Sequence, residues 1–505
     1  GALTTGGADI YHWKGTIRNL VSRGVVVVTL QYRLGMLGFF TTFSEEFPPN
    51  RGIYDQLLAL QWVKREISMF GGDPDRITLF GQSAGATSVS ALALSPLAKG
   101  LFNQVIQTSG SLLQEFETPT DPRGSIHKER ASQICGVDDA TWISPNINSI
   151  LTDCLLKATS DELIKYDFST DLSWNVELDG ALFPDYPENL VKTRSAYPAL
   201  IGDVLEEYAF FIPEMISGDL SGVGRSTIDR ELRKLWPQYD NGTYSTLVDT
   251  MINRYSPTPP ADDDHLGWAQ LTTSIMTGMM FDDFEQRDVQ WYQDNGNNNT
   301  FFFTYAHRSL FAVPFVVDGW NPVAHCAELP FLWFYPKLWT QPGASPQDYA
   351  TAENMGRIFT DFARNRNPGW EASGVDRKYM TIADTLETGS KWRDDADYVY
   401  NEQFPSILGE FPPLTIGNDS WTMLKDTAAK VLNDLATIEC GCYPKTTAVP
   451  STSTMTVTIP TTTLPSDNTI TVTDNEQTTT KGSNLAFHPT ILLFTIYCLR
   501  ILFYR

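Results

Sequence analysis

Short apolar runs alternate with stretches of helical periodicity along the chain up to about residue 305. The first run, Val25–Leu30, reads VVVVTL, which is typical of a strand that is buried on both faces of a parallel sheet. A helical pattern follows at Tyr54–Ser68. The alternation predicts a mostly parallel α/β sheet with right-handed crossovers and flanking helices. The further runs of strand length are Ile77–Phe80, Gln104–Thr108, Ala199–Ile201 and Thr300–Tyr305.

The pattern changes abruptly after residue 442. Residues 443–484 are rich in Thr, Ser and Pro without apolar periodicity, which is typical of an extended, flexible and O-glycosylated linker. Residues 485–505 are apolar, although Arg500 interrupts them. Three interpretations of this end are open: a membrane span, a lipid-anchor signal, or unstructured read-through. We therefore expect a globular domain over 1–442, then the linker, and an attachment to a membrane with the domain outside the cell.

The run Gly81-Gln82-Ser83-Ala84-Gly85 lies between an apolar run and a helical segment of small residues. Gly-x-Ser-x-Gly between a strand and a helix is the nucleophile elbow of the α/β-hydrolases. A strand that turns directly into a helix crowds its apex, and glycines at Gly81 and Gly85 relieve that crowding. The motif predicts Ser83 as an exposed nucleophile, with the N–H of Ala84 free to bind a developing oxyanion. A structural turn serine is the alternative.

Several stretches around this motif resemble the type-B carboxylesterase and cholinesterase family. They are Tyr32–Gly35, Asn50–Phe70 and Phe70–Gly85, and the resemblance extends from residue 1 to about residue 435. It implies an α/β-hydrolase fold whose first strands would precede residue 1, so we expect the chain to be truncated at its N-terminus. It also implies that the mostly helical stretches 210–300 and 330–430 lie over the carboxyl edge of the sheet.

The acid that orients the catalytic base should follow a later strand, because α/β-hydrolases carry their triad in the order Ser, acid, His. The segment after Ala199–Ile201 offers three carboxylates, Asp203, Glu206 and Glu207, and local physics does not choose among them. The resemblance implies Glu207, because the family places its acid five residues after the glycine at position 202. The family often has glycine next, where this chain has tyrosine, and a surface carboxylate is the alternative role.

The base must be a histidine that follows the acid in the chain. Of the six histidines, those at 12 and 127 precede the acid, that at 488 lies in the tail, and His265 lies in an acidic loop. His307 directly follows a predicted strand and is the rival candidate. His325 begins HCAELPFLWF, which resembles the histidine loop of the family, and we predict His325 as the base. Nearby aromatics, Trp320 and Phe331–Phe334, suggest an apolar gorge, with core packing as the alternative.

A second set of backbone donors to the oxyanion should come from a glycine-rich loop. The family uses a His-Gly-Gly-Gly-type run, and Gly1-Ala2-Leu3 resembles the end of such a run. The resemblance implies Gly1, Ala2 and Ala84 as the donors, with Ala2 in place of the commoner glycine. Because Gly1 carries an ammonium instead of an amide in this chain, we expect the chain to be weakly active or unable to fold alone.

Six cysteines are present, and two of them, Cys135 and Cys154, flank a polar loop. The family has a disulfide at the matching place, which implies a Cys135–Cys154 bridge in an oxidising compartment; two free thiols are the alternative. A homodimer linked through Cys440 or Cys442 is a further hypothesis. The Asn-x-Ser/Thr sequons, which fit secretion and N-glycosylation, are at Asn241, Asn298 and Asn418.

The net charge of −23 disfavours nucleic acid as a partner and favours solubility or a cationic ligand. Histidines and cysteines do not cluster at metal-ligand spacings, and the sequence has no phosphate-binding glycine loop followed by Lys-Ser/Thr. We therefore expect neither a metal nor a cofactor.

The leading hypothesis is a secreted or surface serine esterase that acts on a small-molecule carboxylic ester through an acyl-enzyme. Ser83 would attack, His325 would act as base and acid, and Glu207 would orient the imidazole. A cholinesterase is a narrower alternative, disfavoured because the cholinesterases that resemble this chain carry Glu where it has Gln82. A catalytically inactive cell-adhesion protein like the neuroligins, which keep the fold and lose the triad, is the alternative from another class.

Overall fold

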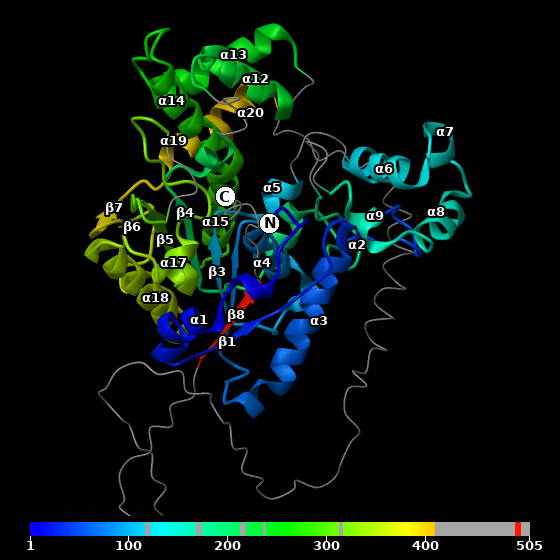
Figure 1. Ribbon diagram of the computed structural model, residues 1–505, viewed down its shortest axis with the longest axis horizontal. Helices are drawn as coiled ribbons and strands as arrows, with labels where there is room; N and C mark the ends of the chain where they lie inside the picture. Colours follow the sequence, from blue (N-terminus) through cyan, green and yellow to red (C-terminus); the bar gives the residue numbers. More distant parts are fainter. Residues whose placement is uncertain are drawn as a thin grey trace, which may run out of the picture. The chain divides into compact units, whose positions relative to one another are not determined.

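A computed structural model of the protein describes residues 1–116, 122–167, 174–212, 219–235, 239–312, 317–409 and 490–495. Within these ranges the chain forms an eight-stranded sheet with the order β1-β8-β2-β3-β4-β5-β6-β7 (Figure 1). Neighbouring strands run parallel except β6 and β7, which pair antiparallel. The strands are β1 Val25–Thr29, β2 Ile77–Gln82, β3 Gln104–Thr108, β4 Ala199–Val204, β5 Thr300–Tyr305, β6 Tyr379–Ile382, β7 Leu386–Gly389 and β8 Thr490–Thr495.

This sheet confirms the predicted α/β class. The five apolar runs found in the sequence form β1 to β5, although β2 and β4 continue beyond the predicted ends. The hairpin of β6 and β7 lies in the stretch 330–430, which we expected to be mostly helical. Its strands have four residues each, and runs this short are not assigned by periodicity.

Helices cover one face of the sheet around α18 (Pro346–Asn365), which packs against β1 and β8 with α1 (Trp13–Asn19) and α16 (Leu329–Trp333) nearby. Helix α18 begins at a capping box: the Ser345 hydroxyl accepts the N–H of Asp348, and the Asp348 carboxylate accepts the N–H of Ser345. The buried apolar side chains of these helices and of the strands beneath them form one core.

On the opposite face α4 (Ala84–Leu94) packs against β2 and β3, and α15 (Asp283–Asp294) packs against β5. Every residue of α4 is buried, because α3 (Arg51–Glu66) and α5 (Leu112–Phe116) enclose it on the side away from the sheet. Small residues all around this helix suit such an enclosed position. Because α4 is held between the sheet and these helices, the turn that leads from β2 into α4 is held in place as well.

A second apolar core belongs to α12 (Arg225–Leu235), α13 (Asn241–Tyr255) and α14 (His265–Thr277), which lie at the top of Figure 1. Helix α14 contacts the short helix η6 (Glu207–Phe211), which directly follows β4. These helices confirm the helical assignment of 210–300 and its position beyond the carboxyl end of the sheet. The remaining helices are α2 Gly35–Phe39, α6 Pro122–Cys135, α7 Asp139–Trp142, α8 Ile147–Leu155, α9 Ser160–Ile164, α10 Pro187–Leu190, α17 Pro336–Trp339, α19 Asp394–Ala396 and α20 Phe404–Leu408.

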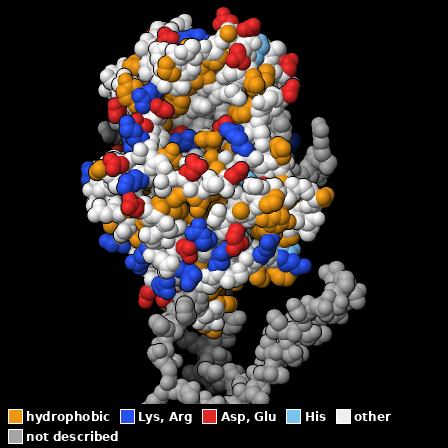
Figure 2. Space-filling model, turned by 90° about the vertical axis from the view of Figure 1, so that its left-hand side faces the viewer, with side chains coloured by type: hydrophobic (Ala, Val, Ile, Leu, Met, Phe, Trp, Pro, Cys, Tyr) orange, Lys and Arg blue, Asp and Glu red, His pale blue; other side chains and the backbone are white. Residues whose placement is uncertain are grey.

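Cys135 and Cys154 form a disulfide, with their Cα atoms 5.9 Å apart, as the family resemblance implied. Of the sequon asparagines, Asn241 and Asn298 are exposed, and Asn418 lies outside the described residues. On the face drawn in Figure 2, acidic and basic side chains are interspersed, which fits solubility as the role of the net charge.

The predicted linker, residues 443–484, and the cysteines at 440 and 442 lie outside the described residues. Within the predicted membrane segment 485–505, the structure describes Thr490–Thr495, which form β8 between β1 and β2. None of the helices in the described part of the chain is both long enough and apolar enough to cross a bilayer. The division of the chain into these three parts stays a prediction.

Candidate active site

Ser83 occupies the turn between β2 and α4. Its φ of 57° and ψ of −128° lie outside the regions that L-residues commonly adopt, as a nucleophile elbow requires. A Cβ atom on Gly81 would lie 2.0 Å from the carbonyl oxygen of Gly85, so the elbow needs glycine at position 81. The backbone N–H of Ser83 donates to the carbonyl of Thr108 in β3 at 2.9 Å, which holds the turn against the sheet.

Glu207 and His325 lie together beyond the carboxyl ends of the strands. Glu207 Oε2 lies 2.5 Å from His325 Nδ1, while Oε1 accepts the backbone N–H of Val204 at 2.8 Å. The Glu207 side chain is fully buried, and His325 is 7% exposed. A carboxylate that accepts the Nδ1 proton leaves Nε2 as an acceptor, which is the tautomer that a general base needs.

Gln82 faces the other ring nitrogen of His325. Its Nε2 lies 3.3 Å from His325 Nε2 and 3.3 Å from Cys326 Sγ. No hydrogen bond links the Ser83 hydroxyl to His325 in the described part of the chain. An uncharged amide thus lies next to the ring nitrogen that a general base would use. Sequence reasoning used Gln82 only to disfavour a cholinesterase, although its position next to the nucleophile signalled a role in the site.

The three carboxylates that the sequence left open have three different partners. Asp203 accepts from Arg393 Nε at 2.7 Å. Glu206 accepts from Arg308 Nη1 at 2.8 Å and from Nη2 at 2.9 Å. Only Glu207 among them contacts the imidazole in the described structure. The role of Glu207 as the acid, chosen from the family resemblance, stays a prediction that this contact supports.

The three predicted oxyanion donors differ in their surroundings. The nitrogen of Gly1 donates to the carbonyl of Thr5 at 2.6 Å. Ala2 has a φ of 53°, in the left-handed region that favours glycine, which explains why glycine is the commoner residue there. Ala84 is the first residue of α4, where a backbone N–H has no carbonyl partner within the helix. The roles of all three stay predictions, and Ala84 has the geometry that supports one.

The sequence pattern of the carboxylesterase family matches residues 1–394. The chain belongs to this family. It is 29% identical over 411 residues to the medium-chain fatty acyl-CoA hydrolase precursor of Anas platyrhynchos, with 78% of this chain and 69% of the relative covered. It is 28% identical over 431 residues to carboxylesterase 5A of Canis lupus familiaris, with 81% and 70% covered. It is 30% identical over 436 residues to carboxylesterase 3 of Homo sapiens, with 81% and 72% covered.

Membership of the carboxylesterase family confirms the resemblance seen in the sequence, including the α/β-hydrolase fold. It also supports the enzyme class predicted from the motifs, a carboxylic ester hydrolase. Within the described residues no group of histidine, cysteine or carboxylate side chains is arranged to hold a metal ion.

A cluster of buried carboxyls lies behind the Glu207 side chain of this carboxylesterase fold. Arg393 contacts two of them, with Nε 2.7 Å from Asp203 and 3.5 Å from Asp282. Burial raises the pKa of Asp203 and Asp282, and burial with the charge of Asp203 raises the pKa of Glu285. Neither oxygen of Glu285 has a hydrogen-bond partner among the described residues. Burial therefore shifts Asp282 and Glu285 toward their neutral forms, while Asp203 is paired with Arg393.

Glu328, in the histidine loop, is a second buried carboxyl near the triad. It is 1% exposed, and neither of its oxygens has a hydrogen-bond partner in the described part of the protein. Burial raises its pKa to about 8, and the charge of Glu207 acts in the same direction. Glu328 is therefore protonated at neutral pH and adds no negative charge to the site.

The aromatic surroundings of His325 differ from those expected. Its ring lies 5.0 Å from the ring of Phe281 and 6.1 Å from that of Phe210. The side chains of Phe331–Phe334, which suggested a gorge, belong to the apolar core under α18, so the alternative of core packing holds for them. Trp320 is buried and donates to Glu206 Oε1 at 3.2 Å. The missed residues are Phe210 in η6 and Phe281 in the short helix η7 (Gly278–Asp282), both far from His325 in the sequence.

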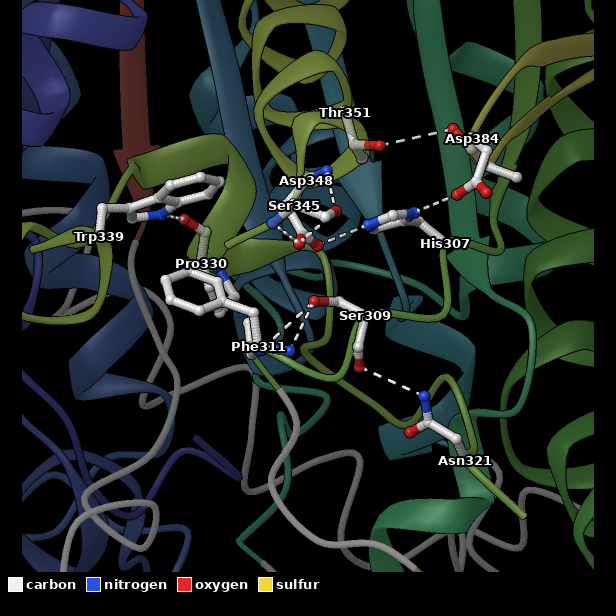
Figure 3. A network of polar contacts seen from close by, with 12 residues as sticks. His307, Ser309, Phe311, Asn321, Pro330, Trp339, Ser345, Asp348, Thr351 and Asp384 are labelled. Atoms are coloured by element: carbon white, nitrogen blue, oxygen red, sulfur yellow. Dashed lines mark hydrogen bonds and ion pairs between the residues drawn. The ribbon is translucent and has the colours of Figure 1, made fainter. Parts of the chain in front are cut away.

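The rival histidine, His307, is committed to other partners. Its Nδ1 lies 2.8 Å from Asp384 Oδ1, and its Nε2 lies 2.8 Å from Asp348 Oδ1 (Figure 3). These carboxylates come from the β6–β7 turn and from the capping box of α18. Because both ring nitrogens are bound, His307 has no free nitrogen with which to take a proton from a serine.

Proposed function

We propose that the protein hydrolyses carboxylic esters through a triad of Ser83, His325 and Glu207. The observation that carries this proposal is the 2.5 Å contact between Glu207 Oε2 and His325 Nδ1, beyond the same sheet edge at which Ser83 occupies a strained elbow. Membership of the carboxylesterase family supports the same chemistry. An adhesion protein that lacks activity would have no need for this buried pair together with the elbow.

Each side chain has a defined step. Ser83 Oγ attacks the ester carbonyl while His325 Nε2 takes its proton, and the N–H of Ala84 stabilises the oxyanion. The imidazolium then gives the proton to the leaving alkoxide, which yields the alcohol and an acyl-enzyme. Water attacks the acyl-enzyme by the same route in reverse, releasing the acid. For the first step the Ser83 hydroxyl must lie within hydrogen-bond distance of His325 Nε2, the nitrogen that the Gln82 amide faces.

The proposal also covers the cellular compartment of the protein and its partner. The Cys135–Cys154 disulfide supports an oxidising compartment such as the secretory pathway. The partner is a small-molecule ester, and Gln82 favours a general carboxylesterase over a cholinesterase, as in the sequence analysis. N-glycosylation, attachment to a membrane through the C-terminal segment and a homodimer stay predictions.

Reaction with an organophosphate tests this proposal. We expect one covalent adduct per chain, found at Ser83 by mass spectrometry of the digested protein. The variant Ser83→Ala should lose the adduct, and its kcat/KM for a 4-nitrophenyl ester should fall roughly ten-thousand-fold. Ser22→Ala, at an exposed serine outside the site, is the matched control and should react like the wild type. An adduct at another residue, or activity retained by Ser83→Ala, would refute the triad.

A further inference from the structure

The carboxylate of Glu206, next to the proposed catalytic acid, accepts four hydrogen bonds. Two come from Arg308, to Oε2 at 2.8 Å and to Oε1 at 2.9 Å, in a bidentate arrangement. Trp320 Nε1 donates to Oε1 at 3.2 Å, and the backbone N–H of Val323 donates to Oε2 at 2.7 Å. Two of these donors, Trp320 and Val323, lie in the segment that leads to His325.

The backbone of this segment is tied to the acid segment as well. The N–H of Glu206 donates to the carbonyl of Val323 at 3.1 Å, and the N–H of His325 donates to the carbonyl of Glu207 at 3.3 Å. The two segments therefore lie side by side over the positions that carry the acid and the base. A shift of Val323 relative to Glu206 would move the imidazole relative to its carboxylate.

Arg308 belongs to a third segment, which follows β5 and is itself anchored. His307 is held by Asp348 and Asp384, and the carbonyl of Ser309 accepts from Asn321 Nδ2 at 3.3 Å (Figure 3). Arg308 Nη1 also donates to the carbonyl of Asn321 at 2.5 Å. Arg308 thus connects a fixed loop at the sheet edge to both segments that carry the acid and the base.

We propose that Glu206 and Arg308 are positioning residues that hold His325 in register with Glu207. This inference rests on the proposed triad. The Glu206 and Arg308 side chains are 15% and 41% exposed, and an ion pair this accessible contributes little to stability by itself. Its bidentate geometry instead fixes the orientation of the two side chains relative to each other. Misplacement of a catalytic group by about 1 Å lowers rates by up to about a hundred-fold. Loss of the pair should therefore lower the rate of ester hydrolysis more than it lowers stability.

The variants Glu206→Ala and Arg308→Ala test the pair by its kinetic pattern. We expect kcat for a 4-nitrophenyl ester to fall about ten- to one-hundred-fold in each, with KM changed less than three-fold or so. The double variant should be no slower than the worse single variant, because both changes remove one interaction. Arg308→Lys should recover only part of the rate, since ammonium lacks the planar fork. Arg225→Ala, which breaks the exposed pair with Asp249, is the matched control and should keep wild-type kcat.

The pH–rate profile separates positioning from a simple charge effect. Removing Glu206 leaves an unpaired cation near the imidazole, and removing Arg308 leaves an unpaired anion. If the pair acted through charge, the acidic limbs of the two variants would move in opposite directions, to lower and to higher pH respectively. Positioning predicts that both variants lose the plateau rate in the same direction. Opposite shifts with unchanged plateaus would overturn the proposal.

A readout without turnover keeps this inference distinct from the proposed function. The proton between Glu207 and His325 should produce a downfield NMR resonance that Glu207→Gln removes. We expect this proton to exchange with water at least ten times faster in Glu206→Ala and Arg308→Ala than in Arg225→Ala. If the wild type hydrolyses no ester but shows this pattern, the function fails and the positioning role stands. Equal exchange rates would refute the positioning role even in an active enzyme.

Discussion

His325 and His307 both lie in loops beyond the carboxyl end of the sheet, and carboxylates bind both. His325 has one carboxylate, at Nδ1, and an uncharged amide near Nε2. His307 has a carboxylate on each nitrogen, at 2.8 Å in both cases. A carboxylate on one ring nitrogen orients the imidazole and leaves the other nitrogen able to accept a proton. Carboxylates on both ring nitrogens leave neither nitrogen to accept one. The proposed base and the structural histidine therefore differ in the partner of a single ring nitrogen, Nε2.

The two regions also differ in what their carboxylates connect. Glu207 is fully buried, and within the described ranges its carboxylate binds the imidazole of His325 and the N–H of Val204. Asp348 joins His307 to the start of α18. Its pKa is lowered, because hydrogen bonds from Ser309, Ser345 and His307 outweigh the effect of burial, which raises it. We infer that the His307 region stabilises the fold, while the His325 region carries the proposed triad.

Replacing each histidine separately, as His325→Ala and His307→Asn, gives the largest expected effect on activity and on stability. His325→Ala should lower kcat/KM roughly ten-thousand-fold with little change in the urea midpoint of unfolding. His307→Asn should keep kcat/KM within about three-fold and lower the free energy of unfolding by roughly 3 kcal/mol, because Asp348 loses a buried partner. Ester hydrolysis and urea titrations on the same preparations measure both quantities. A large kinetic loss in His307→Asn would restore it as the rival base.

How much of this comparison follows from the sequence depends on how local each feature is. The elbow was predicted because Gly81, Ser83 and Gly85 create it within one turn. The apolar runs of β2 to β5 were found because both faces of those strands are buried. The run of β1 was expected to be buried in the same way, but only Val25 is buried and Thr29 is exposed. Neither pattern could choose between Glu206 and Glu207, because that choice depends on a contact with a loop more than a hundred residues away. The family resemblance made that choice, which stays a prediction.

Other features were beyond local reasoning for similar reasons. The β6–β7 turn supplies Asp384 to His307, yet its strands are too short for a periodic signal. The sequence of Phe331–Phe334 fits the wall of a substrate gorge as well as it fits the apolar core. The structure shows that these side chains belong to the core under α18. The strand Thr490–Thr495 was expected in a membrane segment, because apolar runs suit a buried strand as well as a lipid environment.

Glu328 differs from Glu207 and Asp348, because it is a buried carboxyl to which no imidazole or cation is bound in the part of the chain that the structure describes. Its folded pKa of about 8 lies above the unfolded value near 4.3, so the folded state holds a proton that the unfolded state loses. The stability of the wild type should therefore fall as pH rises between those values, by up to about 1.4 kcal/mol per pH unit. Glu328→Gln cannot lose this proton, so urea titrations at pH 5 and pH 8 should show a smaller decline. An identical decline in both proteins would contradict a buried neutral Glu328.

Gln82→Glu is the smallest expected change, and it moves the His325 region toward the situation at His307. The new carboxylate would lie at the position of an amide nitrogen now 3.3 Å from His325 Nε2. A negative charge at this distance favours the imidazolium, so the acidic limb of the pH–rate profile should move up by about one unit. Below that limb the variant should be about ten-fold slower, and at high pH its rate should approach that of the wild type. Gln82→Ala is the control, because it removes the amide without adding charge and should leave the limb unmoved. If Gln82→Glu leaves the limb in place as well, the Gln82 side chain does not face the reacting nitrogen in solution, and the amide contact at Nε2 is not the feature that distinguishes the two histidines.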